Sequence, residues 1–323
     1  MPQRQKKFPY FIWMILISII FLRPFISSNA FPFLNLYYNI TLTLAGCIFL
    51  ISTKRKINFN KQDLPILLFL ISIVISNFFS IQPLISLGVS FKFIIFIFVF
   101  FLIRTLNDYE KKQLIFTIIT AAIIISLYAI YQYLFGFRHI LDYIAKYKVD
   151  YPYAQDFLSR KRVFATFFSP DMLAGYLILI IPLVLGHLLK PENKSRATCY
   201  VLRATLVILF ISLFLTKSLG AILSLFLGLL IFPILSHKLR KKIILPLLIL
   251  FIFMITVIFL RQSQIFDIKS QHNPFVQRLC YWEEPIRIIK SHPFLGIGLG
   301  NLQIPESIFA HNSYLQIWAE LGL

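Results

Sequence analysis

A run of twenty residues at positions 84–103, LISLGVSFKFIIFIFVFFLI, has the length and composition of a membrane-spanning helix. It contains one charged residue, Lys92, and it is long enough to cross the ~30 Å hydrocarbon core of a bilayer as an α-helix. Similar runs lie near 10–28, 33–52, 64–80, 114–135, 171–189, 199–216, 218–236 and 243–260. The sequence therefore predicts an all-α, polytopic integral membrane bundle with about nine complete spans and the start of a tenth at about 313.

The composition agrees with a membrane protein. Hydrophobic residues make up 58% of the chain, which is more than soluble domains carry. The net charge of +19 would suggest nucleic acid as the partner of a soluble protein, but most Lys and Arg lie between the spans. We therefore expect membrane lipids, and no nucleic acid, as partners. The three cysteines have neither disulfide nor metal-site spacing.

The positions of Lys and Arg predict the orientation of the chain, because cytoplasmic loops are enriched in them. The turns 29–32 and 80–83 carry none. The basic segments fall on the opposite side, and they are the N-terminus, 53–63, 104–112, 190–203 and 238–242. We therefore expect a cytoplasmic N-terminus. The predicted parts are N-terminal spans (1–136), an outer loop (137–170), central spans (171–260), a large outer loop (261–311) and the start of a C-terminal helix (312–323).

Both outer loops carry basic residues that the orientation rule does not explain. They are either solvated charges offset by nearby acids or a site for an anion. Arg287 can pair with Glu283 on a helix, whereas Arg162 and Arg278 have no acid three or four positions away. Arg162 and Arg278 are therefore candidates to bind phosphate through the guanidinium fork. Lys217, at the junction of two spans, either joins such a site or extends to the membrane interface.

His311 precedes a predicted helix start. Ser313 and Gln316 form a capping-box pattern, and the dipole of a helix that begins there disfavours positive charge on the imidazole. A neutral imidazole can act as a general base on a hydroxyl group, although a ring that merely caps the helix is the alternative. The run Gly296–Gly300 lacks the spacing of a nucleotide-binding loop and predicts a tight turn, which either offers backbone amides to an anion or serves as a plain connector. We expect no metal and no cofactor.

Several blocks of this sequence resemble the O-antigen ligase and O-antigen polymerase superfamily of bacterial envelope proteins. The blocks are RVFATF (162–167), SPDMLAGY (169–176), TKSLGA (216–221), and a stretch from Arg278 to Gly322 that includes Trp282, His292-Pro293, the glycine turn and His311-Asn312. Asp171 stands where the family usually has Asn. Leu219 stands where an Arg is usual, which leaves Lys217 as the cation available to replace it.

The resemblance implies a metal-independent transferase in the bacterial inner (plasma) membrane. Its donor is a glycan linked to a polyprenyl diphosphate, its acceptor is a hydroxyl of a glycan or lipid, and its active-site loops lie on the outer face. Arg162 and Arg278 then hold the diphosphate, and His311 is the base. Ligase and polymerase activities remain open, because they differ in the acceptor.

Two other expectations complete the sequence-based interpretation. Family members continue beyond the last helix, so we expect the chain to be C-terminally truncated. The alternative function is a transporter or flippase of lipid-linked or anionic envelope precursors, which is expected to have interrupted helices in matching halves and polar residues at the midplane. An envelope assembly protein without catalysis is a third possibility.

Overall fold

The computed structural model of the chain describes residues 3–26, 32–147, 158, 160–189, 195–235, 237–260, 274–304 and 309–322. Within these ranges the protein is helical and no β-strand forms. The chain divides into two compact units. The first comprises Met1–Ile12, Asn39–Asn107 and Arg261–Leu323, and the second comprises Trp13–Tyr38 and Asp108–Leu260.

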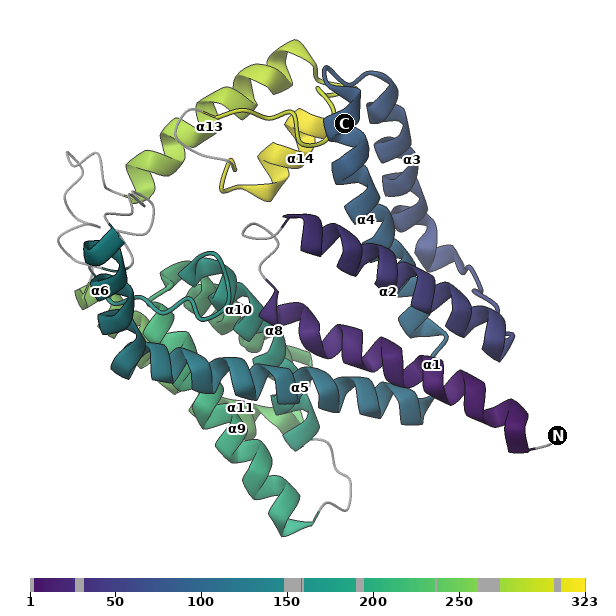
Figure 1. Ribbon diagram of the computed structural model, residues 1–323. Helices are drawn as coiled ribbons and strands as arrows, with labels where there is room; N and C mark the ends of the chain where they lie inside the picture. Colours follow the sequence, from purple (N-terminus) through teal and green to yellow (C-terminus); the bar gives the residue numbers. More distant parts are fainter. Residues whose placement is uncertain are drawn as a thin grey trace. The chain divides into compact units, whose positions relative to one another are not determined.

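The second unit is built around the packed helices α5, α8, α9, α10 and α11 (Figure 1). Its described elements are the end of α1 (Gln3–Leu22), η1 (Arg23–Phe25), α5 (Asp108–Tyr131), the π-helical turn η3 (Gln132–Gly136), α6 (Phe137–Tyr147), α8 (Pro170–Leu189), α9 (Arg196–Thr216), α10 (Leu219–Leu235) and α11 (His237–Leu260). Small buried residues on α5, such as Ala122 and Ser126, allow α9 to approach closely. Ser212 of α9 donates to the Ser126 carbonyl at 3.0 Å.

The first unit contains a helical hairpin against which α14 packs. Its described elements are most of α2 (Pro32–Thr53), η2 (Lys61–Asp63), α3 (Leu64–Phe78), α4 (Pro83–Arg104), α13 (Pro274–Ser291) and α14 (Ser313–Leu321). The predicted helix start at Ser313 is confirmed, but the cap differs from the expected capping box. Asn312 is the N-cap, and its side-chain oxygen accepts from the amides of Tyr314 and Leu315.

The membrane-spanning character is clear from the helices. Among the described residues, seven helical segments are long and apolar enough to cross a membrane. They are Phe8–Phe25, Phe33–Thr53, Lys61–Phe78, Pro83–Arg104, Asp108–Tyr147, Pro170–Leu189 and Arg196–Thr216. Two further apolar helices, Leu219–Ile231 and Ile244–Leu260, are shorter. The chain is therefore a multi-pass membrane protein, as predicted, while the expected count of nine spans plus one stays a prediction.

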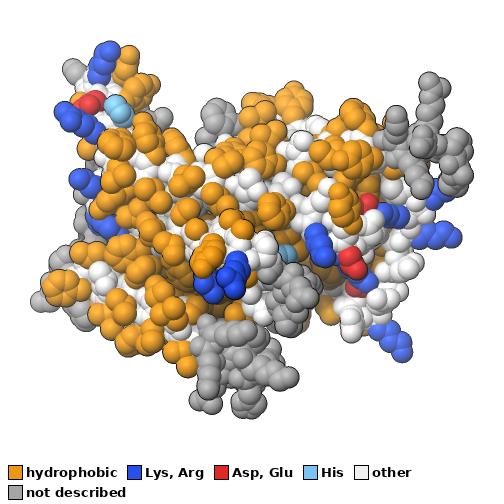
Figure 2. Space-filling view, turned by 90° about the horizontal axis from the view of Figure 1, so that it is seen from below, with side chains coloured by type: hydrophobic (Ala, Val, Ile, Leu, Met, Phe, Trp, Pro, Cys, Tyr) orange, Lys and Arg blue, Asp and Glu red, His pale blue; other side chains and the backbone are white. Residues whose placement is uncertain are grey.

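Hydrophobic side chains cover most of the molecular face in Figure 2, with Lys and Arg gathered in small separate groups. Large apolar residues such as Phe33, Phe78, Leu84 and Leu179 are more than 70% exposed. Such a surface is stable against lipid tails and not against water. Helix α6 extends into the stretch 137–170 that was expected as an outer loop. Residues 148–157 and 159 of that stretch, and residues 261–273 and 305–308 of the other expected loop, lie outside the described ranges.

Candidate functional site

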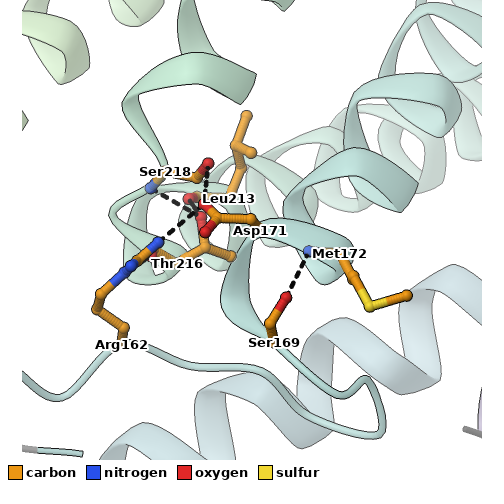
Figure 3. A network of polar contacts seen from close by, with 7 residues as sticks. All are labelled: Arg162, Ser169, Asp171, Met172, Leu213, Thr216 and Ser218. Atoms are coloured by element: carbon orange, nitrogen blue, oxygen red, sulfur yellow. Dashed lines mark hydrogen bonds and ion pairs between the residues drawn. The ribbon is translucent and has the colours of Figure 1, made fainter. Parts of the chain in front are cut away.

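Arg162 is buried in the second unit, and its guanidinium is held from two sides (Figure 3). Its Nε donates to the carbonyl of Thr216, the last residue of α9, at 2.9 Å. Its Nη2 lies 2.9 Å from Oδ1 of Asp171, in the first turn of α8. Arg162 is therefore paired, although local spacing suggested an unpaired cation. The partner was missed because Asp171 lies nine residues away across a loop, outside the range of helical pairing.

Asp171 connects the start of α8 to the junction between α9 and α10. Its Oδ1 also accepts a hydrogen bond from Oγ of Ser218 at 2.6 Å. The amide of Ser218 donates to Oγ1 of Thr216 at 3.3 Å, and that hydroxyl donates to the Leu213 carbonyl at 2.6 Å. The polar residues at the helix junction thus form one network around Arg162 (Figure 3). Sequence reasoning noted Asp171 only as a departure from the family pattern and did not single out Ser218.

Lys217 ends α9 in a left-handed backbone conformation, with φ of 50°. Its Nζ donates to the Arg160 carbonyl at 2.6 Å, so the ammonium group lies beside the loop that carries Arg162. The amide of Val163 adds a hydrogen bond to the Leu215 carbonyl at 3.2 Å. The structure therefore brings two of the sequence-predicted site residues, Arg162 and Lys217, together at the end of α9.

Gln132 fixes the same loop from the side of α5. It lies in the π-helical turn η3, and its Oε1 accepts from the amides of Phe164 at 3.0 Å and Ala165 at 2.8 Å. Turns of this kind are frequent at functional sites, because the extra residue redirects a side chain out of the regular helix. Sequence reasoning missed Gln132, since one glutamine at the end of an apolar run carries no distinctive signal.

The cluster contains more positive than negative charge. Partial burial lowers the pKa of Lys217, and the positive charges of Arg162 and Lys161 lower it further. A bound anion beside this ammonium group would oppose that shift, because it favours the charged form. The geometry can therefore hold phosphate oxygens through one guanidinium and at least one ammonium group.

The first unit holds the other two predicted site residues, Arg278 and His311. The imidazole of His311 lies beside the ring of Tyr281 on α13, and both Arg278 and His311 are exposed. Arg278 lies three residues before Tyr281, so the two are neighbours on the helix surface. His311 has φ of 52°, an uncommon conformation for a residue with a Cβ and one that clusters at functional sites.

One predicted ion pair on α13 is wrong in its partner. Arg287 pairs with Glu284 at 2.6 Å, three residues before it, and the predicted partner was Glu283, four residues before it. Both spacings place side chains on the same helix face, so the sequence alone does not choose between adjacent glutamates. The pair also raises the pKa of Arg287.

The glycine turn, Gly296–Gly300, docks onto the end of α14. The amides of Ile297 and Gly298 donate to the carbonyls of Ala319 and Glu320, at 3.1 and 2.9 Å. These two amides are therefore engaged within the protein and are not free to bind an anion. The turn thus acts as scaffold, one of the two roles that its sequence suggested.

Three serines on and between α3 and α4 form a polar seam that receives the turn. Ser76 donates to the Glu320 carbonyl at 3.0 Å, Ser86 donates to the Leu299 carbonyl at 2.9 Å, and Ser80 accepts from Asn301 at 2.7 Å. We call Ser76, Ser80 and Ser86 the serine seam. It fixes α14, and through α14 the segment that carries His311, to the hairpin.

Comparison with known proteins gives one match. A model of the O-antigen ligase family matches residues 204–323. No curated protein and no solved structure matches the chain. The matched region contains Lys217, Arg278 and His311, while Arg162 precedes it. The resemblance to the O-antigen ligase and polymerase superfamily is thereby confirmed over these residues. The chain is a multi-pass membrane protein in which residues 204–323 are similar to O-antigen ligases. Within the described ranges, no three His, Cys, Asp or Glu residues form a group able to hold a metal.

Proposed function

We propose that this protein is a metal-independent membrane glycan transferase of the O-antigen ligase or polymerase type. It moves an oligo- or polysaccharide from a polyprenyl diphosphate to a hydroxyl acceptor. It lies in the bacterial inner membrane with a cytoplasmic N-terminus and with its active-site loops on the outer face. The observation that carries the proposal is the cluster of Arg162 and Lys217, held rigidly at the end of α9 with an excess of positive charge.

Arg162 and Lys217 bind the diphosphate in this proposal. Nε and Nη2 of Arg162 are engaged, whereas Nη1 makes no hydrogen bond with the residues that the structure describes. The ammonium group of Lys217 has three N–H donors, and one is directed at the Arg160 carbonyl. Both side chains therefore retain donors for phosphate oxygens. Fixed donors of this kind stabilise charge that grows on a leaving group, because they need no reorganisation during the reaction.

His311 and Arg278 supply the other roles. The imidazole of His311 takes the proton of the acceptor hydroxyl, whose oxygen attacks the anomeric carbon of the donor sugar. The bond from that carbon to the diphosphate oxygen breaks, and the electron pair leaves with the polyprenyl diphosphate. Arg278 is a second cation for the departing diphosphate. A single displacement of this kind inverts the configuration of the anomeric carbon.

Glycan transfer by the purified chain in lipid vesicles tests the proposal. With a polyprenyl-diphosphate-linked glycan and a hydroxyl acceptor, His311→Ala should lower kcat by about a hundredfold or more, the usual range for a general base. Arg162→Gln, Lys217→Gln and Arg278→Gln should raise KM for the donor. Arg287→Gln is the matched control, since this exposed arginine pairs with Glu284. Full transfer by His311→Ala would exclude the assigned base. Movement of the lipid-linked glycan across the vesicle membrane, without transfer of the glycan to the acceptor, would instead favour a flippase.

A further inference from the structure

The guanidinium of Arg162 already holds an anion, the carboxylate of Asp171, at 2.9 Å. A phosphate binds a guanidinium through the same N–H groups as a carboxylate does. We propose that Asp171 sets the affinity of this site for diphosphate by competing for Arg162. The proposal rests on the proposed function, which places a diphosphate at the cluster, and it assigns to Asp171 a role that none of the arguments above requires.

The two partners differ in their exposure. The Arg162 side chain is 7% exposed and is anchored through Nε to a backbone carbonyl at a helix end. The Asp171 side chain is 64% exposed and lies in the first turn of α8. An entering diphosphate therefore meets a buried, anchored cation and an exposed carboxylate, and in this proposal Asp171 is the partner that the diphosphate displaces.

Ser218 determines where the carboxylate rests when no ligand is bound. Its hydroxyl donates to Oδ1 of Asp171 at 2.6 Å, the same oxygen that receives Nη2 of Arg162 (Figure 3). One oxygen thus accepts two hydrogen bonds, and both end when the carboxylate turns away. Asparagine in place of Asp171 keeps an acceptor oxygen for both donors, removes the negative charge and replaces the second carboxylate oxygen with an NH2 group.

Charge repulsion gives the direction of the effect. A carboxylate beside a doubly charged phosphate group repels it, and solvent at a partly exposed site weakens this repulsion without removing it. We therefore expect Asp171→Asn to bind diphosphate about tenfold more tightly than the wild type. Asp171→Ala removes the charge and also the oxygen that orients Arg162, so it should gain less.

Calorimetric titration of the full chain in nanodiscs with inorganic pyrophosphate measures this difference. The samples are the wild type, Asp171→Asn, Asp171→Ala, Arg162→Gln and a control, Glu284→Gln, which removes the carboxylate paired with Arg287. The expected order of affinity is Asp171→Asn above Asp171→Ala, with Glu284→Gln equal to the wild type and Arg162→Gln below it. In glycan transfer, Asp171→Asn should lower KM for the donor without a matching rise in kcat.

Two results would overturn the role of Asp171. They are equal affinity of the wild type and Asp171→Asn, and no pyrophosphate binding by any variant. The pyrophosphate titration does not depend on glycan transfer. A chain that binds pyrophosphate in the expected order but transfers no glycan would therefore refute the proposed function and leave the competition between Asp171 and diphosphate intact.

Discussion

The imidazole of His311 lies beside the phenol ring of Tyr281, with ring centroids 5.5 Å apart and planes inclined at 31°. The contact joins the loop before α14 to α13, and it limits the orientations that the imidazole can take. A general base has to reach its proton within hydrogen-bond distance, so loss of this ring contact should affect catalysis more than binding.

Tyr281 should therefore matter through its ring. Tyr281→Ala is expected to lower kcat of glycan transfer about tenfold with little change in KM for the donor, because His311 loses its neighbour. Tyr281→Phe keeps the ring contact and should restore most of kcat. Steady-state kinetics with varied donor concentration would show the split. Equal losses in Tyr281→Phe and Tyr281→Ala would show that the ring contact is not what positions His311.

Gly298 should not tolerate a side chain. It has φ of 93°, and a Cβ at this position would lie 2.3 Å from Oγ of Ser80 and 2.6 Å from Oγ of Ser86. Gly298→Ala is expected to destabilise the protein by about 2 kcal/mol or more, since backbone strain and overpacking add. Gly88→Ala is the matched control, because the space around Gly88 in α4 is open. Thermal unfolding in detergent should show a lower Tm for Gly298→Ala alone.

Gln132 should protect the loop that carries Arg162 from proteolysis. Removal of its amide oxygen takes away the acceptor for the backbone amides of Phe164 and Ala165. Each of these donors that stays buried without a partner lowers the stability of the loop by about 1–3 kcal/mol. Gln132→Ala is therefore expected to expose the loop to trypsin, which cleaves after Lys161 and Arg162. Gln132→Glu retains an acceptor and should protect better. A cleavage rate in Gln132→Ala equal to that of the wild type would show that the loop does not need this residue.

Lys217 should favour anion binding without adding to the stability of the fold. Its left-handed backbone suits glycine, so Lys217→Gly is expected to gain about 1 kcal/mol in backbone energy and to lose a hydrogen bond of similar size to the Arg160 carbonyl. Its Tm at neutral pH should therefore match or exceed that of the wild type, while pyrophosphate binding falls.

The pH dependence supplies a second check on Lys217. The pKa of Lys217 is lower in the folded protein than in the unfolded chain, so between those two values the unfolded chain binds more protons. Wild-type stability should consequently rise, relative to Lys217→Gly, as pH increases from the lowered pKa toward the ordinary lysine value. A difference in Tm that does not change over this alkaline range would contradict the direction of the shift.

Most of the architecture could be predicted from the sequence, because lipid requires long apolar helices and such runs are visible without tertiary information. The count of nine spans plus the start of a tenth stays a prediction, since seven helical segments among the described residues are long and apolar enough to cross a membrane. The helix start at Ser313 was predictable from local capping residues, although the capping side chain is that of Asn312.

The contacts of the candidate site were harder to predict. Arg162 and Lys217 could be nominated from charge and position, but their partners depend on how the loop folds back on α9. Asp171 and the Thr216 carbonyl meet Arg162 only in three dimensions. Gln132 and the serine seam gave no signal, because single polar residues in apolar helices are common and their role appears only when a distant segment packs against them.

The serine seam also has a consequence for biosynthesis. Ser76 and Glu320 are separated by 244 positions, and Ser86 and Leu299 by 213, so each contact joins an early part of the nascent chain to a late one. Contacts of such long range form late, because the intervening chain must first be ordered. The hairpin of α3 and α4 therefore enters the bilayer with its seam empty. The segment that carries His311 is therefore fixed to the hairpin only after translation has passed Glu320, so any chemistry that needs this imidazole in place must wait for that step.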